Sequence, residues 1–277
     1  MLRSLKDLEN YEIGAKDGAI GHVKDFYLDD RAWVVRYLIV DTGSWLSHRK
    51  VLISPMSLNE PNWLAKLLPT SITKDKVKNS PPIDTDKPVS VQNEMQYLGY
   101  YGYPNYWEGS GFWGESNYPG MYGSGLSREE FDREFRQPRS ESSSNSFRNG
   151  SQRDEDHHLR SCKALIGYHI HAQDGEIGHL QDMLVDETTW SIRYLILNTS
   201  NWWLGQLVVV APDWITQVRW ADKTIEIDLT RETIKGAPVY EPNAEFDRER
   251  EGRLYAHYGR ASYWSDDAIL GSALHRV

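Results

Sequence analysis

The sequence predicts a mainly β protein in which two small β-barrel domains, each with a short C-terminal helix, are joined by a flexible linker. Three observations predict this fold class: a tandem repeat, short runs of β-branched and aromatic residues between turns, and a polar segment between the repeats. The chain has 277 residues, which suits two domains better than one. We divide it into a first domain (1–107), a linker (108–160), a second domain (161–264) and a C-terminal tail (265–277).

A shift of 157 positions superimposes one half of the sequence on the other without a gap. Residues 15–55 and 172–212 then share 17 identities in 41 positions. The agreement continues downstream, where Tyr106 and Trp107 align with Tyr263 and Trp264. Chance does not produce such agreement, so the pattern indicates a tandem duplication of a unit of about one hundred residues.

The residues within each repeat predict short strands. Residues 23–28 and 33–40 are β-branched and aromatic, and the polar residues between them predict a hairpin. The second repeat has the same pattern, and in both repeats a third strand ends at a proline. A further hairpin is predicted over 214–229 in the second repeat only. A short helix then follows in each repeat, with Thr73 or Thr230 as its N-cap.

The segment between the repeats, residues 108–160, is rich in Ser, Gly and charged residues. It has too little apolar surface to offset the entropy of ordering, which predicts a flexible linker. Its first part, residues 112–122, is aromatic, and we expect it to fold back onto a domain or to contact a partner. His157 and His158 near its end are expected to be an exposed pair rather than a loose metal site.

The charge and the cysteine content limit the functions that the protein can have. The 31 Lys and Arg residues against 40 Asp and Glu residues give a net charge of -9, which disfavours a dedicated nucleic-acid binder. The single cysteine, Cys162, fits a reducing cytoplasm. The start of the sequence has no apolar signal region, and no apolar stretch approaches the ~20 residues of a spanning helix. We therefore expect a soluble, cytoplasmic protein that meets a membrane only at its surface.

Three motifs present in both repeats carry a family resemblance: Asp-Gly-x-Ile-Gly-His, Trp-x-x-Arg-Tyr-Leu-Ile and Val-x-x-x-Pro. Together they resemble the PRC-barrel domain, a fold shared by the photosynthetic reaction-centre H subunit and a ribosome-maturation protein. The later Lys-x-x-Pro and Tyr-Gly-x-x-x-Tyr-Trp blocks resemble bacterial members of the family, several of which carry two copies. The resemblance implies small β-barrels and an adaptor role.

Repeated polar residues are the first candidates for a site: Asp17, Gly18, Gly21, His22, Asp174, Gly175, Gly178 and His179. We expect the Asp-Gly pairs to form turns, because Asp caps its own turn and Gly accepts a positive φ. The histidines are expected to be structural strand residues. The alternatives are a catalytic carboxylate, or a histidine that binds a ligand, senses pH or transfers a proton.

A second candidate feature is a charge pair in each hairpin, Asp25 with Arg36 and Asp182 with Arg193. Both arginines lie in nearly apolar strands, where an unpaired charge is costly. If residues 30 and 31 form the centre of the turn, Asp25 and Arg36 lie directly opposite each other. We therefore predict structural salt bridges. The alternative is that both arginines bind an anionic ligand.

Aromatic residues form the third candidate feature. Those that recur near loops or at the ends of the repeats are candidate partner contacts: Trp45, Trp202, Trp203, Tyr106, Trp107, Tyr263 and Trp264. Such side chains bury a large area with few rotors and often anchor protein interfaces. The alternative is that they plug the barrel ends or form a lid on each barrel.

No motif for an activated nucleophile, a phosphate-binding loop or a metal centre occurs, so we predict no enzyme activity, cofactor or metal. The predicted function is an adaptor or scaffold that binds protein partners, including a membrane-protein complex or a second copy of itself. The family resemblance also leaves open a light-reaction role like that of the H subunit, and an RNA- or ribosome-associated role. Nucleic acid is the less favoured partner because of the acidic charge.

Overall fold

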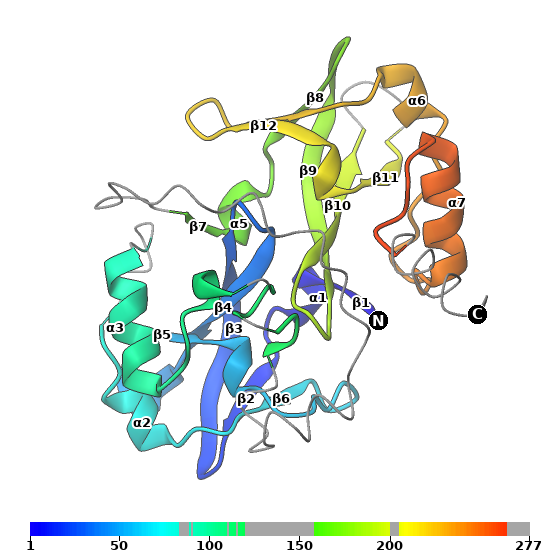
Figure 1. Cartoon of the computed structure of the whole chain (residues 1–277). Helices are drawn as coiled ribbons and strands as arrows, with labels where there is room; N and C mark the ends of the chain where they lie inside the picture. Colours follow the sequence, from blue (N-terminus) through cyan, green and yellow to red (C-terminus); the bar gives the residue numbers. More distant parts are fainter. Residues whose placement is uncertain are drawn as a thin grey trace, which may run out of the picture.

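The computed structural model describes residues 1–82, 89, 91–109, 111–114, 116–119, 158–199 and 205–264. The strands form two sheets, one built mainly from each repeat (Figure 1). We call residues 1–119 the first half and residues 158–264 the second half. The predicted mainly β fold with two similar units is confirmed.

Each half contains a comparable series of elements. The first half comprises β1 (Leu2–Ser4), α1 (Leu5–Leu8), β2 (Glu12–Ala15), β3 (Gly18–Asp29), β4 (Val34–Asp41), η1 (Gly43–Leu46), β5 (Lys50–Ile53), η2 (Pro55–Ser57), β6 (Leu67–Pro69), α2 (Lys74–Lys78), α3 (Val91–Tyr101) and η3 (Tyr106–Glu108). The second half comprises β7 (Leu159–Ser161), α5 (Cys162–Leu165), β8 (His169–Ala172), β9 (Gly175–Asp186), β10 (Ile192–Asn198), β11 (Leu207–Val210), η5 (Pro212–Trp214), β12 (Ile215–Arg219), β13 (Thr224–Ile227), α6 (Arg231–Lys235) and α7 (Arg248–Tyr258).

The β3–β4 hairpin forms the centre of the first half, and β9–β10 forms the centre of the second. β4 is buried along almost its whole length, as its run of Val, Ile, Leu and Tyr predicts. The chain turns between the strands at residues 30–33, where Trp33 has a positive φ of 52°. Trp190 has the same conformation in the second half, with a φ of 60°. The hairpin predicted from the sequence is therefore confirmed in both halves.

Two helices follow the strands of each half. α2 and α3 lie on the outer side of the first sheet, and α6 and α7 lie on the outer side of the second (Figure 1). Thr73 and Thr230 cap α2 and α6, as predicted, because each side chain accepts a hydrogen bond from a backbone N–H three residues later. The longer helices α3 and α7 were not predicted as helices. α3 packs on the first sheet, where the hydroxyl of Tyr97 donates to the carbonyl of Leu52 at 2.7 Å.

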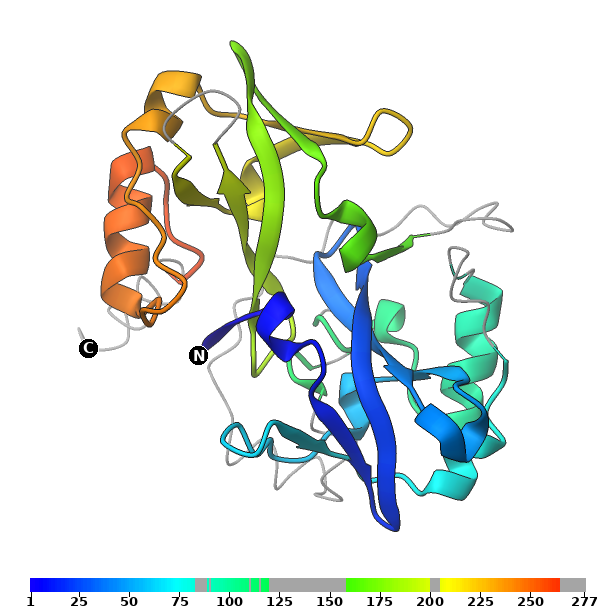
Figure 2. The same ribbon diagram turned by 180° about the vertical axis from the view of Figure 1, so that it is seen from behind.

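The two halves exchange their first strands. β1 begins the first half but pairs antiparallel with β9 of the second sheet. β7 begins the second half but pairs antiparallel with β3 of the first sheet. In Figure 2, β1 and α1 lie beside β9, and β7 and α5 lie beside β3. We call residues 1–8 the first arm and residues 158–165 the second arm.

This exchange corrects the predicted boundaries. Residues 158–160 were assigned to a flexible linker, but they belong to the second arm and pack on the first half. Trp113, also assigned to the linker, is buried and donates its indole N–H to the carbonyl of Thr189 in the second half at 2.9 Å. Phe112 and Trp113, in the aromatic part of the predicted linker, thus contact residues of both repeats. Residues 120–157 and the tail 265–277 lie outside the described residues.

One continuous apolar core runs through both halves and includes residues of β3, β4, β9 and β10. No helix in the part of the chain that the structure describes is long and apolar enough to cross a membrane.

Candidate functional site

The seam between the halves is built from reciprocal contacts of the two arms. Ser161 of the second arm donates to the carboxylate of Asp25 at 2.5 Å, and the backbone N–H of Lys163 donates to it at 3.0 Å. In the first arm, Ser4 donates to Asp182 at 2.5 Å and the N–H of Lys6 donates at 3.3 Å. Each aspartate therefore holds the start of a short helix that belongs to the other half.

Two further contacts repeat across the seam. Arg3 of the first arm pairs with Glu187 at 2.7 Å, and Arg160 of the second arm pairs with Asp30 at 3.0 Å. At the centre, where β4 and β10 meet, the N–H of Val35 donates to the carbonyl of Trp190 at 2.8 Å. The N–H of Ile192 donates to the carbonyl of Trp33 at 2.7 Å. The seam is thus a pseudo-two-fold interface within one chain.

The predicted salt bridges between Asp25 and Arg36 and between Asp182 and Arg193 are wrong. The turn takes residues 30–33, so that Asp29 lies opposite Val34, and a β-bulge at Arg36 in β4 shifts the register by one more residue and leaves Asp25 opposite Ile39. The same bulge recurs at Arg193 in β10 and leaves Asp182 opposite Ile196. Both aspartates contact the arms instead, as described above. Burial raises the pKa of each carboxyl, and the hydrogen bonds from Ser161 and Ser4 only partly oppose this effect.

The arginines pair with a different aspartate in each hairpin. Arg36 lies 3.0 Å from Asp29, and both side chains are buried. Burial raises the pKa of Asp29, but the charges of Arg36 and His158 and two backbone N–H bonds lower it more, so its pKa lies below the ordinary value. The corresponding pair, Arg193 with Asp186, is longer at 3.7 Å and partly exposed. The arginines are thus structural charge-pair residues, as expected, but with different partners.

Beside Arg36 lies a buried polar cluster that centres on Glu94 of α3. Glu94 is fully buried, and one of its oxygens accepts hydrogen bonds from Tyr37 at 3.0 Å and from Tyr106 at 2.8 Å. His158 of the second arm places Nε2 3.1 Å from the other oxygen and 2.9 Å from the hydroxyl of Tyr106. The guanidinium of Arg36 lies 3.8 Å from the centre of the Tyr106 ring. The prediction that His158 is exposed is therefore wrong.

The second half contains an equivalent cluster around Glu251 of α7. Its carboxylate accepts hydrogen bonds from Tyr194 at 2.9 Å and from Tyr263 at 3.0 Å. Arg248, one turn earlier in the same helix, pairs with it at 2.9 Å. Arg193 lies over the ring of Tyr263 at 4.2 Å. Burial and the nearby carboxylate raise the pKa of Tyr194 strongly, so this phenol stays protonated and donates.

Sequence reasoning missed Glu94 and Glu251, although a signal for them exists. The two residues align at the same shift of 157 positions that relates the repeats. Each also follows its hydrogen-bonding tyrosine, Tyr37 or Tyr194, by 57 positions. An acidic residue that recurs within an otherwise aromatic segment is the pattern that would have indicated a buried carboxylate.

Asp17 and Asp174 lie in turns, as predicted, but their carboxylates accept hydrogen bonds from distant helices rather than from their own turns. Asp17 accepts a hydrogen bond from the N–H of Lys74, at 2.8 Å, and Asp174 accepts one from the N–H of Arg231, at 2.7 Å, so each fixes the start of a short helix. Gly18 and Gly175 have φ values of 133° and 137°. At Gly21 and at Gly178, a Cβ atom would lie 1.9 Å from a backbone carbonyl oxygen of the neighbouring strand. Only glycine fits these two positions.

The repeated histidines lie on the central hairpins. His22 is exposed on β3 between Glu12 and Asp41, and His179 is half-buried on β9 between His169 and Asn198. Among the described residues, no group of three or more His, Cys, Asp and Glu side chains could hold a metal ion.

The aromatic candidates differ in accessibility. Tyr106 is buried within the Glu94 cluster and is not available to a partner, which corrects the prediction. Tyr263 contacts Glu251 and Arg248. Trp107 is half-buried beside Tyr106, and Trp264 is half-buried beside Tyr263; the ring centres of each pair lie 4.8 Å apart. Trp45 is half-buried, donates its indole N–H to the carbonyl of Ile20 and lies under the ammonium of Lys74. Trp202 and Trp203 lie outside the described residues.

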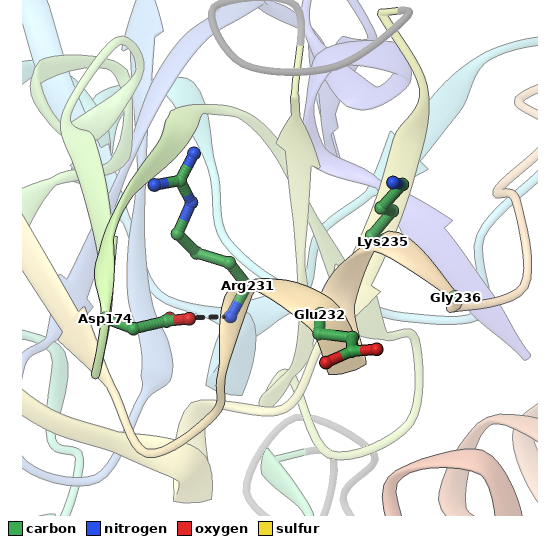
Figure 3. A pocket seen from close by; sticks show the side chains of 5 residues that line it. All are labelled: Asp174, Arg231, Glu232, Lys235 and Gly236. Carbon is green, nitrogen blue, oxygen red and sulfur yellow. Dashed lines mark hydrogen bonds between the residues drawn. The ribbon is translucent and has the colours of Figure 1, made fainter.

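A shallow pocket of about 630 Å³ lies on the second half and is shown in Figure 3. Its lining residues are Asp174, Arg231, Glu232, Lys235 and Gly236. Figure 3 shows Asp174 directed at the backbone N–H of Arg231, which is the helix-capping bond described above. Because both acidic and basic side chains line the pocket, it has no dominant charge that would select one class of ligand.

Comparison with curated proteins finds no significant match for the chain. Comparison with protein families matches residues 2–62 to the PRC-barrel domain. The matched segment contains the first arm, the β3–β4 hairpin and β5, which are the elements that build the seam and the centre of the first sheet. Residues 2–62 therefore match the PRC-barrel domain that the sequence resemblance predicts.

Proposed function

We propose that the protein is a non-enzymatic adaptor that binds protein partners through two PRC-barrel units held in a fixed relation. A PRC-barrel domain indicates a general protein-interaction or scaffold role. The observation that carries the proposal is the exchange of the two arms, because it joins the halves through sheet hydrogen bonds as well as through the chain itself. A scaffold needs such a fixed spacing between its binding faces.

The buried ionisable residues support the same proposal. Glu94, Glu251 and Arg36 are engaged by tyrosine, histidine, arginine or aspartate side chains within the protein. These contacts join the charged groups to other side chains of the protein itself. A catalytic site instead needs a charged or nucleophilic group that faces a substrate.

Trp107 and Trp264 are the aromatic residues that we assign to the partner interface. They recur at equivalent positions, and each packs one edge on a buried or half-buried tyrosine while part of its surface remains accessible. Partly exposed tryptophans are over-represented among the residues that dominate binding energy at protein interfaces. We expect the protein to act in the cytoplasm, where the partner includes a membrane-protein complex.

Affinity capture from the native host tests the proposal. The full chain, Trp107→Ala, Trp264→Ala and the control Met95→Ala are used as baits, and captured proteins are quantified by mass spectrometry. Met95 is a suitable control because it is 53% exposed on α3, away from the tryptophan positions in sequence. We expect each tryptophan variant to lower capture of a specific protein at least about tenfold, while the control does not.

Two outcomes would contradict the proposal. Equal capture by the wild type and both tryptophan variants would exclude these side chains as the interface. Capture of ribosomal particles or RNA in place of a protein would favour the alternative role as an RNA-associated factor.

A further inference from the structure

The two halves balance the charge of their buried glutamates in different ways. In the second half, Arg248 pairs with Glu251 from one turn away in the same helix. An arginine keeps its charge at all physiological pH values. The corresponding position in the first half is Val91, which carries no charge. Glu94 therefore receives no cation from its own helix at this position.

His158 contacts Glu94 in place of that cation. Its Nε2 atom lies 3.1 Å from the free oxygen of Glu94 and 2.9 Å from the hydroxyl of Tyr106. His158 is 7% exposed and belongs to the second arm, so it comes from the other half of the protein. In the first arm the corresponding residue is Met1, whose side chain cannot carry a proton.

The other charged groups around His158 are already balanced. Arg36 of β4 pairs with Asp29 of β3, and Asp30 of the turn pairs with Arg160. Tyr106 of η3 and Tyr37 of β4 donate to Glu94 and are neutral. Among the described residues, the cation that matches the charge on Glu94 is therefore the protonated imidazole of His158.

We propose that His158 is a proton-linked latch, whose charged imidazolium holds the second arm on the first half and whose deprotonation loosens that arm. The latch also determines which arm the first half accepts. An arm with methionine at this position would leave the Glu94 carboxylate buried without a cation, which is strongly destabilising. The first half thus prefers the arm of the second half to an arm of its own kind.

The direction in which docking of the second arm changes with pH follows from the charged form of His158. An adjacent carboxylate favours the protonated imidazole, whose ordinary pKa is about 6.5. The docked arm holds one proton more tightly than the released arm does. Docking is therefore strongest at acidic pH and weakens as the pH rises through and above about 7.

Hydrogen exchange of the intact full chain tests the latch, with the first arm as an internal control. The measurement is the protection factor of the β7 and β1 amides between pH 6 and pH 8, corrected for intrinsic exchange. We expect protection of β7 to fall by up to about tenfold per pH unit, which is the limit for one linked proton. Protection of β1 should change little, because Arg248 stays charged over this range. An equal change in both arms would overturn the proposal.

Two variants separate the latch from ordinary packing. In His158→Met, β7 should lose protection at all pH values in this range and lose its pH dependence. In Glu94→Gln, the buried charge is gone, so β7 should stay protected but without pH dependence. If His158→Met does not fold, Glu94→Gln still decides the question. A pH slope in Glu94→Gln that equals that of the wild type would contradict the latch.

Discussion

The charge pair between Asp29 and Arg36 gives the most direct test of the structure. We consider the substitution Asp29→Asn, which keeps the shape of the side chain and removes its charge. Asp29 is 6% exposed and Arg36 is 3% exposed, and their closest atoms lie 3.0 Å apart. The variant therefore leaves the guanidinium of Arg36 buried without its carboxylate.

The expected loss of stability depends on the contacts that Arg36 keeps in the Asp29→Asn variant. Removing one partner of a buried ion pair typically costs about 3–5 kcal/mol. Arg36 still donates to the carbonyl of Phe112 and lies over the Tyr106 ring at 3.8 Å, so we expect a loss of stability at the lower end, about 3 kcal/mol. Asp186→Asn is the matched control at the equivalent position. Its pair with Arg193 is 3.7 Å long and about one-fifth exposed, which predicts a loss below about 1 kcal/mol.

Urea unfolding of both variants and the wild type measures the difference at pH 7. The pH dependence gives a second readout, because the pKa of Asp29 is lowered in the folded protein. The stabilisation is then present above the ordinary aspartate pKa of about 3.9 and is lost as the pH falls below it. The penalty of Asp29→Asn should shrink accordingly in acid. Equal penalties for the two variants at pH 7 would refute the assignment of a buried pair to the first half alone.

Three further predictions concern the turns, the seam and the connection between the halves. Gly21→Ala should lower the free energy of unfolding by more than about 3 kcal/mol, because its Cβ would overlap a carbonyl oxygen at 1.9 Å. The control Gly252→Ala in α7 places its Cβ in open space and should be neutral or stabilising by up to about 1 kcal/mol. Thermal unfolding of the two variants compares these effects. Asp25→Asn should change stability at pH 7 by less than about 1 kcal/mol, since burial raises the pKa of Asp25 and its charged form is disfavoured in the fold. The wild type should lose stability relative to Asp25→Asn as the pH rises through the raised pKa of Asp25. If the difference in melting temperature between the two proteins does not change with pH, the prediction is wrong. A chain cut at a protease site introduced within residues 120–157 should elute as one particle on gel filtration, because β1 and β7 each remain paired in the sheet of the other half. Elution as two separate fragments would contradict the exchange of the arms.

The repeat in the sequence predicts two similar sheets, but it does not predict which sheet each arm joins. The first strands of the halves have the same sequence, Leu-Arg-Ser, at residues 2–4 and 159–161. A strand with this sequence fits the β3 edge and the β9 edge equally well. The choice depends on the path of the chain and on contacts outside the strand, such as that between His158 and Glu94.

The predicted register of the β3–β4 hairpin is wrong for a related reason. A regular hairpin with its turn centred on residues 30 and 31 would place Asp25 opposite Arg36, and this is the geometry that the sequence pattern suggests. In the structure Asp29 lies opposite Val34 across the turn, and a bulge at Arg36 in β4 shifts the pairing by one more residue. Arg36 then pairs with Asp29, and Asp25 contacts the second arm. The position of the turn and the place of a bulge leave no clear signal in a single sequence.

The exchange of arms also constrains where a partner can bind. Each half gives one arm and receives one arm, so the pairing closes on itself as a two-fold interface does. The carboxylates that hold the arms, Asp25 and Asp182, are consequently occupied within the protein. A partner that leaves this interface intact must leave these carboxylates in place, and we propose Trp107 and Trp264, which recur once in each half, as its contacts. Because the arms fix the halves relative to each other, a partner that engages both tryptophans binds two sites at one set spacing, and such paired engagement raises the overall affinity without any new contact.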